Sequence, residues 1–185
     1  CMYIGTSAWI AAFSDKLILD RKMKTESHCH VLPNSYDIIS GVSTAGASLD
    51  WFVENFLNGE DDKIVFTAIE REAGRISPSC NGLIFLPYLT GERSPLFNSD
   101  ATGAFTGIRI EHKRSHFLRS VMEGVTFGLR YAIEAVEDAG VKVEELRLAG
   151  GGSKSPLWRR IVSNIIGKRV LFPKNQSPET FGAAL

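Results

Sequence analysis

The sequence feature that most constrains the fold is the stretch Leu146–Pro156, where an apolar strand pattern runs into three consecutive glycines and then into a helix. Residues without a Cβ let backbone N–H groups approach a ligand closely, and a helix that starts at Ser155 directs the positive end of its dipole to the same place. The spacing matches neither the Walker lysine loop nor the glycines of a dinucleotide-binding turn. Two interpretations stay open: a cradle for a nucleotide or phosphate, and a tight turn in which glycine only supplies a positive φ.

Length and charge limit the classes of protein to which the chain can belong. Its 185 residues, 44% of them hydrophobic, suit one large domain with a well-filled core. The 21 basic and 21 acidic residues leave no positive excess for a nucleic acid or an acidic membrane. The sequence has no apolar run long enough to span a bilayer and no leader pattern. Because it enters a strand pattern at residue 1 without an initiator Met, we expect it to be part of a longer protein.

The cysteines and two histidines do not form a metal or disulfide pattern. Cys1, Cys29 and Cys80 are odd in number and lack CxxC spacing, which favours free thiols in a reducing, cytoplasmic setting. His28 and His30 alternate as strand residues do, without an obvious third ligand. We therefore expect no bound metal here.

The first half of the chain predicts strands followed by a helix. Residues 2–13 read as a hairpin around the tip Gly5-Thr6-Ser7, and further strands are expected at Leu17–Leu19 and His28–Leu32. Small polar residues at the tip either donate hydrogen bonds to a phosphate or form a plain turn. From Ala47 the apolar spacing is helical, which puts Gly46 at a helix N-terminus.

The second half predicts two helices, a buried strand and a long loop. The acidic run 59–62 is typical of the start of a helix that ends near Gly74, and needs no metal. Asn81–Tyr88 reads as a buried strand, and the irregular segment 89–103 has the length of a functional loop. Ser115–Ala139 carries an apolar residue at about every fourth position, which predicts a long helix facing the core.

The remaining elements complete an α/β pattern. A helix is expected over residues 157–166, a strand over 169–172, and the first turn of a last helix from Ser177. Strands followed by strand–helix–strand–helix indicate an α/β or α+β domain, and we expect a five-stranded mixed sheet crossed by the helix 115–139.

Several charged residues are candidates for chemistry or for structure. Glu92 and Arg93 are the charged pair of the long loop, and they either line a cleft or form an ion pair that pins the loop. Glu123 lies among apolar helix positions, which favours a satisfied buried acid over a catalytic group. His112 and His116 flank a helix start, where capping or packing is expected.

Three glycine turns and one signature resemble a known family. The tip at Thr6, the helix opened by Gly46 about forty residues later and the late glycine turn occur together in the FGGY carbohydrate kinases, relatives of actin and hexokinase. The segment Gly103–Ile108, followed after seven residues by His116–Glu123, is similar to the family's C-terminal signature. Phe85–Pro95 and residues 150–158 resemble the xylulokinase and gluconokinase branches, and the resemblance runs from Gly5 to Leu185.

The resemblance implies a fold and an activity. The fold would be a ribonuclease-H-like domain of the actin and hexokinase type, an α/β mixed sheet with helices on both faces. Residues 1–185 would form the C-terminal, ATP-facing domain of a kinase that transfers a phosphoryl group from ATP, with Mg²⁺, to a sugar or polyol hydroxyl. The expected substrate is a pentulose such as D-xylulose, with gluconate or L-ribulose as alternatives. A non-catalytic nucleotide-binding regulatory module and a ligand-free interaction domain also stay open.

The resemblance also assigns site residues. The catalytic Asp base is expected in an N-terminal domain absent from this chain, so the partners are ATP, a small sugar and that domain, with a homodimer also open. Asp50 and Pro156 stand where glycerol kinases have Gln and Asn, which points away from the glycerol branch. The Gly152→Val change is expected to weaken ATP binding without unfolding the domain. The expected nucleotide-binding residues are Thr6, Gly46, Asp50, Gly151, Gly152 and Ser153.

Overall fold

The computed structural model describes residues 1–57, 68 and 70–174. The acidic run 59–62 and the helix expected from Ser177 lie outside the described residues. The start of the helix expected to end near Gly74 also lies outside them.

The N-terminal hairpin is confirmed. Strands β1 (Met2–Ile4) and β2 (Ala8–Ser14) pair antiparallel up to Ile4 opposite Ala8, which leaves Gly5-Thr6-Ser7 as the tip. Strand β4 (Tyr36–Val42) pairs antiparallel with the other edge of β2, and β3 (Glu26–Cys29) pairs with β4.

Two parallel strands complete the main sheet on the other side of the hairpin. Strand β7 (Glu145–Ala149) lies parallel to β1, and β8 (Arg169–Leu171) lies parallel to β7. In the described part of the chain the sheet order is β3-β4-β2-β1-β7-β8. The mixed sheet was predicted correctly, but it has six strands rather than five.

Two strand expectations near the N-terminus were wrong in detail. Residues 17–19 form no strand, and Leu17 and Leu19 are exposed. The second strand runs from Glu26 to Cys29 instead of His28–Leu32. It ends there because the chain turns: the His30 N–H donates to the Ser35 carbonyl, and the His30 ring accepts from the Leu32 N–H.

The strand expected over Asn81–Tyr88 is shorter than predicted. A 3-10 turn, η1 (Pro78–Gly82), precedes β5 (Ile84–Leu86), which pairs with β6 (Ala104–Thr106) in a separate two-stranded sheet. Only the middle residue of β5, Phe85, is buried, because helix α3 packs against one face of this small sheet.

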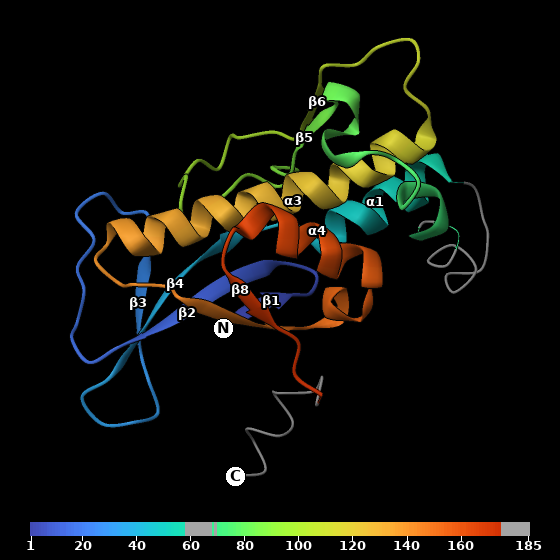
Figure 1. Ribbon diagram of the computed structural model, residues 1–185. Helices are drawn as coiled ribbons and strands as arrows, with labels where there is room; N and C mark the ends of the chain where they lie inside the picture. The colour runs from blue at the N-terminus through green and yellow to red at the C-terminus, as the bar shows by residue number, and fades with distance from the viewer. Residues whose placement is uncertain (58–67, 69, 175–185) are drawn as a thin grey trace.

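Three described helices lie on the same face of the main sheet, α1 (Gly46–Phe56), α3 (Arg114–Asp138) and α4 (Pro156–Ile166) (Figure 1). Helix α3 agrees with the predicted 115–139 within one residue at each end and packs against β4, β2 and α4. The second covered face stays a prediction, because the helix expected to follow Ser177 lies outside the described residues.

The core lies between this sheet face and the helices. Alternate strand residues point into it, which is the period of two expected of a half-buried strand. On the opposite face the Tyr3 and Trp9 rings stack with their centroids 5.2 Å apart. The strand residues that fill the core include Met2, Ile4, Ile10, Ile38, Leu146 and Leu148.

A buried ion pair ties α3 to the segment before β5. Arg119 Nε lies 2.7 Å from Glu123 Oε1, and each side chain is 7% exposed. Arg119 also donates to the Ile76 carbonyl at 2.7 Å, while Glu123 accepts from the Ser79 N–H at 3.1 Å. Burial, followed by the charge of Glu123, raises the pKa of the adjacent Cys80 thiol to about 12. Glu123 is therefore a satisfied buried acid, as expected from the sequence.

Replacing one member of this pair is expected to be costly. Arg119→Met leaves the Glu123 carboxylate buried without its cation, so we expect the free energy of unfolding in urea to fall by about 3–5 kcal/mol. The control is Glu134→Met, since Arg130 and Glu134 have the same i,i+4 spacing but are half exposed and Arg130 keeps its bond to the Ile165 carbonyl; the loss should stay below about 1 kcal/mol. Equal losses would contradict the assigned role of burial.

Candidate functional site

Three connections of the main sheet meet at one edge. Strands β1 and β7 run parallel with Tyr3 opposite Ala149, so the hairpin tip and the glycine turn leave the sheet side by side. Strand β4 ends at Val42, opposite the start of β2 at Ala8, and so reaches the same edge before α1 begins. The structure therefore brings the regions around Thr6, Gly46 and Gly151 together.

The hairpin tip is hydrogen-bonded to the start of α1. The Gly46 N–H donates to the Gly5 carbonyl at 2.8 Å, and the Ala45 and Ala47 N–H groups donate to the Thr6 carbonyl at 2.8 and 3.1 Å. A Cβ on Gly46 would lie 2.6 Å from the Gly5 oxygen. The first donors of α1 thus hold the tip, while Thr6 itself is exposed on its outer side.

The three glycines of the late turn have different surroundings. Gly150 has φ +87° and a Cβ there would lie 2.4 Å from the Ile4 carbonyl oxygen, so β1 requires glycine at this position. A Cβ on Gly152 would lie 2.5 Å from Cγ2 of the fully buried Ile4. Gly151 is exposed and has no atom within 4 Å of that position. Only Gly151 therefore offers open space to a ligand.

This geometry corrects the expectation for Gly152→Val. A valine at 152 would press on the Ile4 side chain in the core, which typically costs about 1–3 kcal/mol. The change would therefore disturb the fold as well as any ligand, and Gly151 is the position that separates the two effects.

Ser153 and Asp50 occupy different environments. The Ser153 hydroxyl is buried and donates to the Gly150 carbonyl at 2.7 Å, so this side chain serves the turn. Asp50 is exposed on α1, four residues after Gly46 and on the same side of the helix. The binding roles expected for both residues stay predictions, and the Ser153 hydroxyl is already engaged within the turn.

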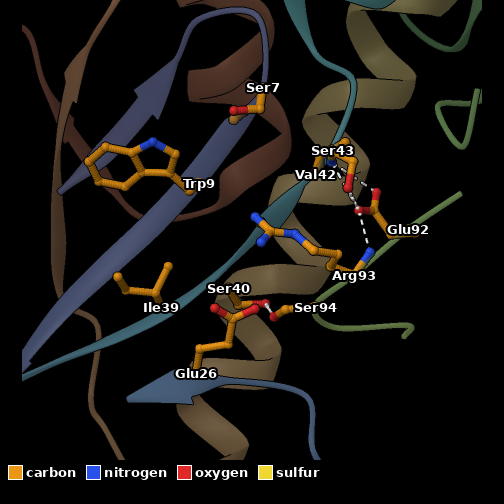
Figure 2. Close-up of a pocket in the computed structure, with 12 residues that line it drawn as sticks. Ser7, Trp9, Glu26, Ile39, Ser40, Val42, Ser43, Glu92, Arg93 and Ser94 are labelled. Carbon is orange, nitrogen blue, oxygen red and sulfur yellow. Dashed lines mark hydrogen bonds between the residues drawn. The ribbon is translucent and has the colours of Figure 1, made fainter. Parts of the chain in front are cut away.

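The buried carboxylate of Glu92 holds the long loop against the connection between β4 and α1 (Figure 2). Its Oε1 accepts from the Ser43 N–H at 2.9 Å, from the Ser43 hydroxyl, and from the Arg93 N–H at 3.0 Å. Among the described residues no ion pair joins the Glu92 and Arg93 side chains. The expectation that the loop is pinned is confirmed, but by backbone and hydroxyl donors instead of the Arg93 guanidinium.

A pocket opens beside β4 at this edge (Figure 2). It exists because β3 begins only at Glu26, opposite Ile39. The same edge of β4 therefore has no paired strand from Ser40 to Val42, and residues 92–94 lie along it. The sequence offered Glu92 and Arg93 as residues that line a cleft, and both line this pocket, but it gave no signal for the walls from β2 and β3. Its lining side chains include Ser7, Trp9, Glu26, Ser43, Glu92 and Arg93.

The remaining polar candidates have structural roles. The His116 ring accepts from the Lys113 N–H at 3.1 Å at the start of α3, and the His112 ring accepts from the Arg109 N–H at 3.0 Å. The capping expected from the sequence is confirmed for His116, whereas the His112 ring bonds within the turn before α3 and does not cap the helix. Within residues 1–57, 68 and 70–174, no group of histidine, cysteine and acidic side chains is arranged to hold a metal ion. None of the described helices is long and apolar enough to cross a membrane.

Comparison with known proteins agrees with this architecture. The chain is 35% identical over 182 residues to a xylulose kinase of Bacillus subtilis, and 31% identical over 190 residues to a gluconokinase of the same organism. These alignments cover 98% of the chain but only 36% and 37% of the relatives. A ligand-bound xylulose kinase structure from Lactobacillus acidophilus superposes with a TM-score of 0.86 at 26% identity, covering 99% of this chain and 36% of that one.

The family match covers almost the whole sequence. The family model described as the C-terminal domain of the FGGY family of carbohydrate kinases matches residues 2–185. This range contains the hairpin tip, the start of α1, the signature on β6 and α3, and the glycine turn. The chain therefore belongs to the FGGY family of carbohydrate kinases and corresponds to its C-terminal domain.

Proposed function

We propose that this chain is the ATP-facing half of a kinase that transfers the γ-phosphoryl group of ATP to a hydroxyl of a pentulose such as D-xylulose. The observation that carries the proposal is the shared edge, where the exposed Thr6 tip and the open Gly151 turn lie side by side after two neighbouring strands. A cytoplasmic enzyme fits the free thiols Cys1, Cys29 and Cys80.

The described residues fit a nucleotide at this edge. Thr6 and Ser7 are exposed on the outer side of the tip and can donate hydrogen bonds to phosphate oxygens. A Cβ on Gly151 would meet no atom within 4 Å, so a flat adenosine part can lie against the backbone there. Asp50 is exposed on α1, one turn after Gly46, and we assign it to the nucleotide side of the domain. Bound ATP with Mg²⁺ would supply the phosphoryl group and a cation that neutralises its oxygens.

The division of labour follows from what this chain lacks. Phosphoryl transfer needs a carboxylate near the attacking hydroxyl, and we assign no catalytic residue in this chain to that role. The relatives it matches are almost three times as long. We therefore place the Asp base and most sugar contacts in an N-terminal domain of the intact protein, across a cleft from the Thr6 tip.

The choice of sugar rests on the relatives. The relative at 35% identity is named a xylulose kinase and the one at 31% a gluconokinase, so a pentulose ranks before gluconate, with L-ribulose as a further alternative. A regulatory nucleotide-binding module would keep the Thr6 and Gly151 edge without a base in the N-terminal part. Turnover by the intact protein distinguishes these two classes.

The first prediction tests the nucleotide site in the intact protein. Gly151→Val fills open space, so the melting temperature should change by less than about 2 °C, while the Kd for ATP should rise about tenfold or more. Isothermal titration and thermal unfolding measure both quantities. The matched control, Gly152→Val, should lower the melting temperature because its side chain meets Ile4. Unchanged ATP affinity in Gly151→Val would argue against adenosine at this turn.

The second prediction concerns activity. The fragment alone should bind ATP only with millimolar or weaker Kd, about −4 kcal/mol, and should release no ADP above background with any sugar. We assign it no general base, a group that typically raises the reaction rate by a factor of about 10² to 10⁴. It also has no facing domain that would hold the two substrates in line.

The assay compares fragment and intact protein with D-xylulose, L-ribulose, gluconate and glycerol in a coupled measurement of ADP release. We expect the intact protein to turn over D-xylulose fastest. Turnover by the fragment would overturn the two-domain proposal, and a silent intact protein that carries the upstream Asp would favour the regulatory module.

A further inference from the structure

We propose that Glu92 is a positioning residue of the phosphoryl-transfer site, because its buried carboxylate fixes the Ser43–Gly46 connection and, through it, the Thr6 tip. This inference rests on the proposed kinase function and adds a role that the glycine turns alone do not supply. Glu92 would contact neither substrate and would act through backbone hydrogen bonds.

Glu92 is hydrogen-bonded to the connection that follows β4. Both carboxylate oxygens lie within hydrogen-bond distance of the Ser43 N–H, at 2.9 and 3.2 Å, and Oε1 also accepts from the Ser43 hydroxyl. The next residue, Thr44, is buried and donates its hydroxyl to the Pro87 carbonyl. Ser43 and Thr44 are thus both held by the segment that runs from β5 into the long loop.

The same connection is hydrogen-bonded to the hairpin tip. Ala45 and Gly46 follow directly, and their N–H groups donate to the Thr6 and Gly5 carbonyls at 2.8 Å each. Between Glu92 and Thr6 there are therefore only two sets of hydrogen bonds and a two-residue stretch of backbone. A displacement of Ser43 is transmitted to the tip that faces the proposed phosphate position.

Glu92 itself is held firmly enough to act as an anchor. Its N–H donates to the Asn98 carbonyl at 2.9 Å, and the Asn98 N–H donates back at 2.8 Å. The preceding residue, Gly91, is also closely packed, since a Cβ there would lie 2.5 Å from the Ser99 carbonyl oxygen. The carboxylate therefore holds Ser43 from a fixed backbone.

The electrostatics argue that this carboxylate is not there for stability alone. Burial raises the pKa of Glu92 above its ordinary value, although the Ser43 and Arg93 hydrogen bonds and the Arg93 charge act in the opposite direction. A raised pKa in the folded state means that stability is lost as the pH rises through it, because the ionised form is the one penalised. Tyr88 also faces Glu92, and its own pKa is raised by burial and then by this carboxylate.

The surroundings of Glu92 differ from those of the equally buried Glu123. Both glutamates are about 5% exposed or less, but Glu123 has the Arg119 guanidinium at 2.7 Å whereas the Glu92 carboxylate accepts its hydrogen bonds from neutral donors. Charge-assisted hydrogen bonds of this kind are short and strong. They fix the position of Ser43, while the burial of the charge has a cost in stability that a neutral acceptor would avoid.

The test uses the intact protein, with ATP and D-xylulose, at a temperature where every variant is folded by circular dichroism. Glu92→Ala should lower kcat by about 10²-fold, the effect typical of a misplacement near 1 Å, and should change the KM for the sugar by less than about threefold. Glu92→Gln keeps an oxygen acceptor for Ser43 and should recover most of kcat. The matched control, Glu123→Ala, removes an equally buried acid and should lower stability while keeping the wild-type kcat.

The outcomes separate this inference from the function on which it rests. Wild-type kcat in Glu92→Ala, or an equal loss in Glu123→Ala, would show a merely structural role and overturn the inference alone. Absence of turnover in the wild-type protein would overturn the proposed function and the inference with it. If Glu92→Ala does not fold, Glu92→Asp takes its place: it keeps the charge but is one methylene too short, so kcat should fall at least about tenfold, and wild-type kcat there would overturn the inference.

A pH series checks the buried charge separately. The wild-type carboxylate is penalised only when it is ionised. The melting temperature of Glu92→Gln minus that of the wild type should therefore be larger at pH 7 than at pH 5. Arg93 faces the group in both proteins, and Tyr88, whose pKa lies above its ordinary value, stays protonated at both pH values, so the difference reports on Glu92. A difference that does not change with pH would show that Glu92 carries no penalised charge.

Discussion

The site depends on the contact between the Gly5-Thr6-Ser7 tip and the start of α1. The N–H groups of residues 45–47 would otherwise be free donors at a helix N-terminus, a common place for anions to bind. Here they donate to the Gly5 and Thr6 carbonyls instead. The helix start therefore serves as a support for the hairpin, and Thr6 itself stays exposed. Gly46 is glycine because this contact leaves no room for a side chain.

Two buried carboxylates show how the same residue type serves different ends. Glu123 is neutralised by Arg119 and joins α3 to the segment before β5, which is a structural use of a buried ion pair. Glu92 has no such cation in the described part of the chain. Its carboxylate oxygens accept hydrogen bonds from Ser43, two residues before the first residue that contacts the tip. Identical burial thus does not imply identical purpose, and what distinguishes the two acids is the identity of their donors.

Local patterns in the sequence were sufficient for much of this fold. The apolar repeat of residues 115–139 and the small polar tip at Gly5–Ser7 predicted α3 and the first hairpin, because both depend on neighbouring residues alone. The strand predicted at Asn81–Tyr88 was too long, because its ends depend on α3 covering only one face of β5. The sequence offered Glu92 and Arg93 as cleft-lining residues, but the other walls of the pocket beside β4 could not be predicted, because only the folded sheet brings Trp9 and Glu26 next to them.

The glycine turn shows how a motif can combine a structural and a binding role at adjacent positions. Gly150 and Gly152 are fixed by the close passage of Ile4 on β1, so glycine would be needed there in a domain that bound nothing. A Cβ on Gly151 would meet no atom within 4 Å, so packing does not require glycine at this position. An absent side chain that packing does not require is the kind of feature that a ligand surface explains. Of the three consecutive glycines, Gly151 is therefore the one that packing does not explain, whereas the sequence alone assigned Gly151 and Gly152 to the nucleotide together.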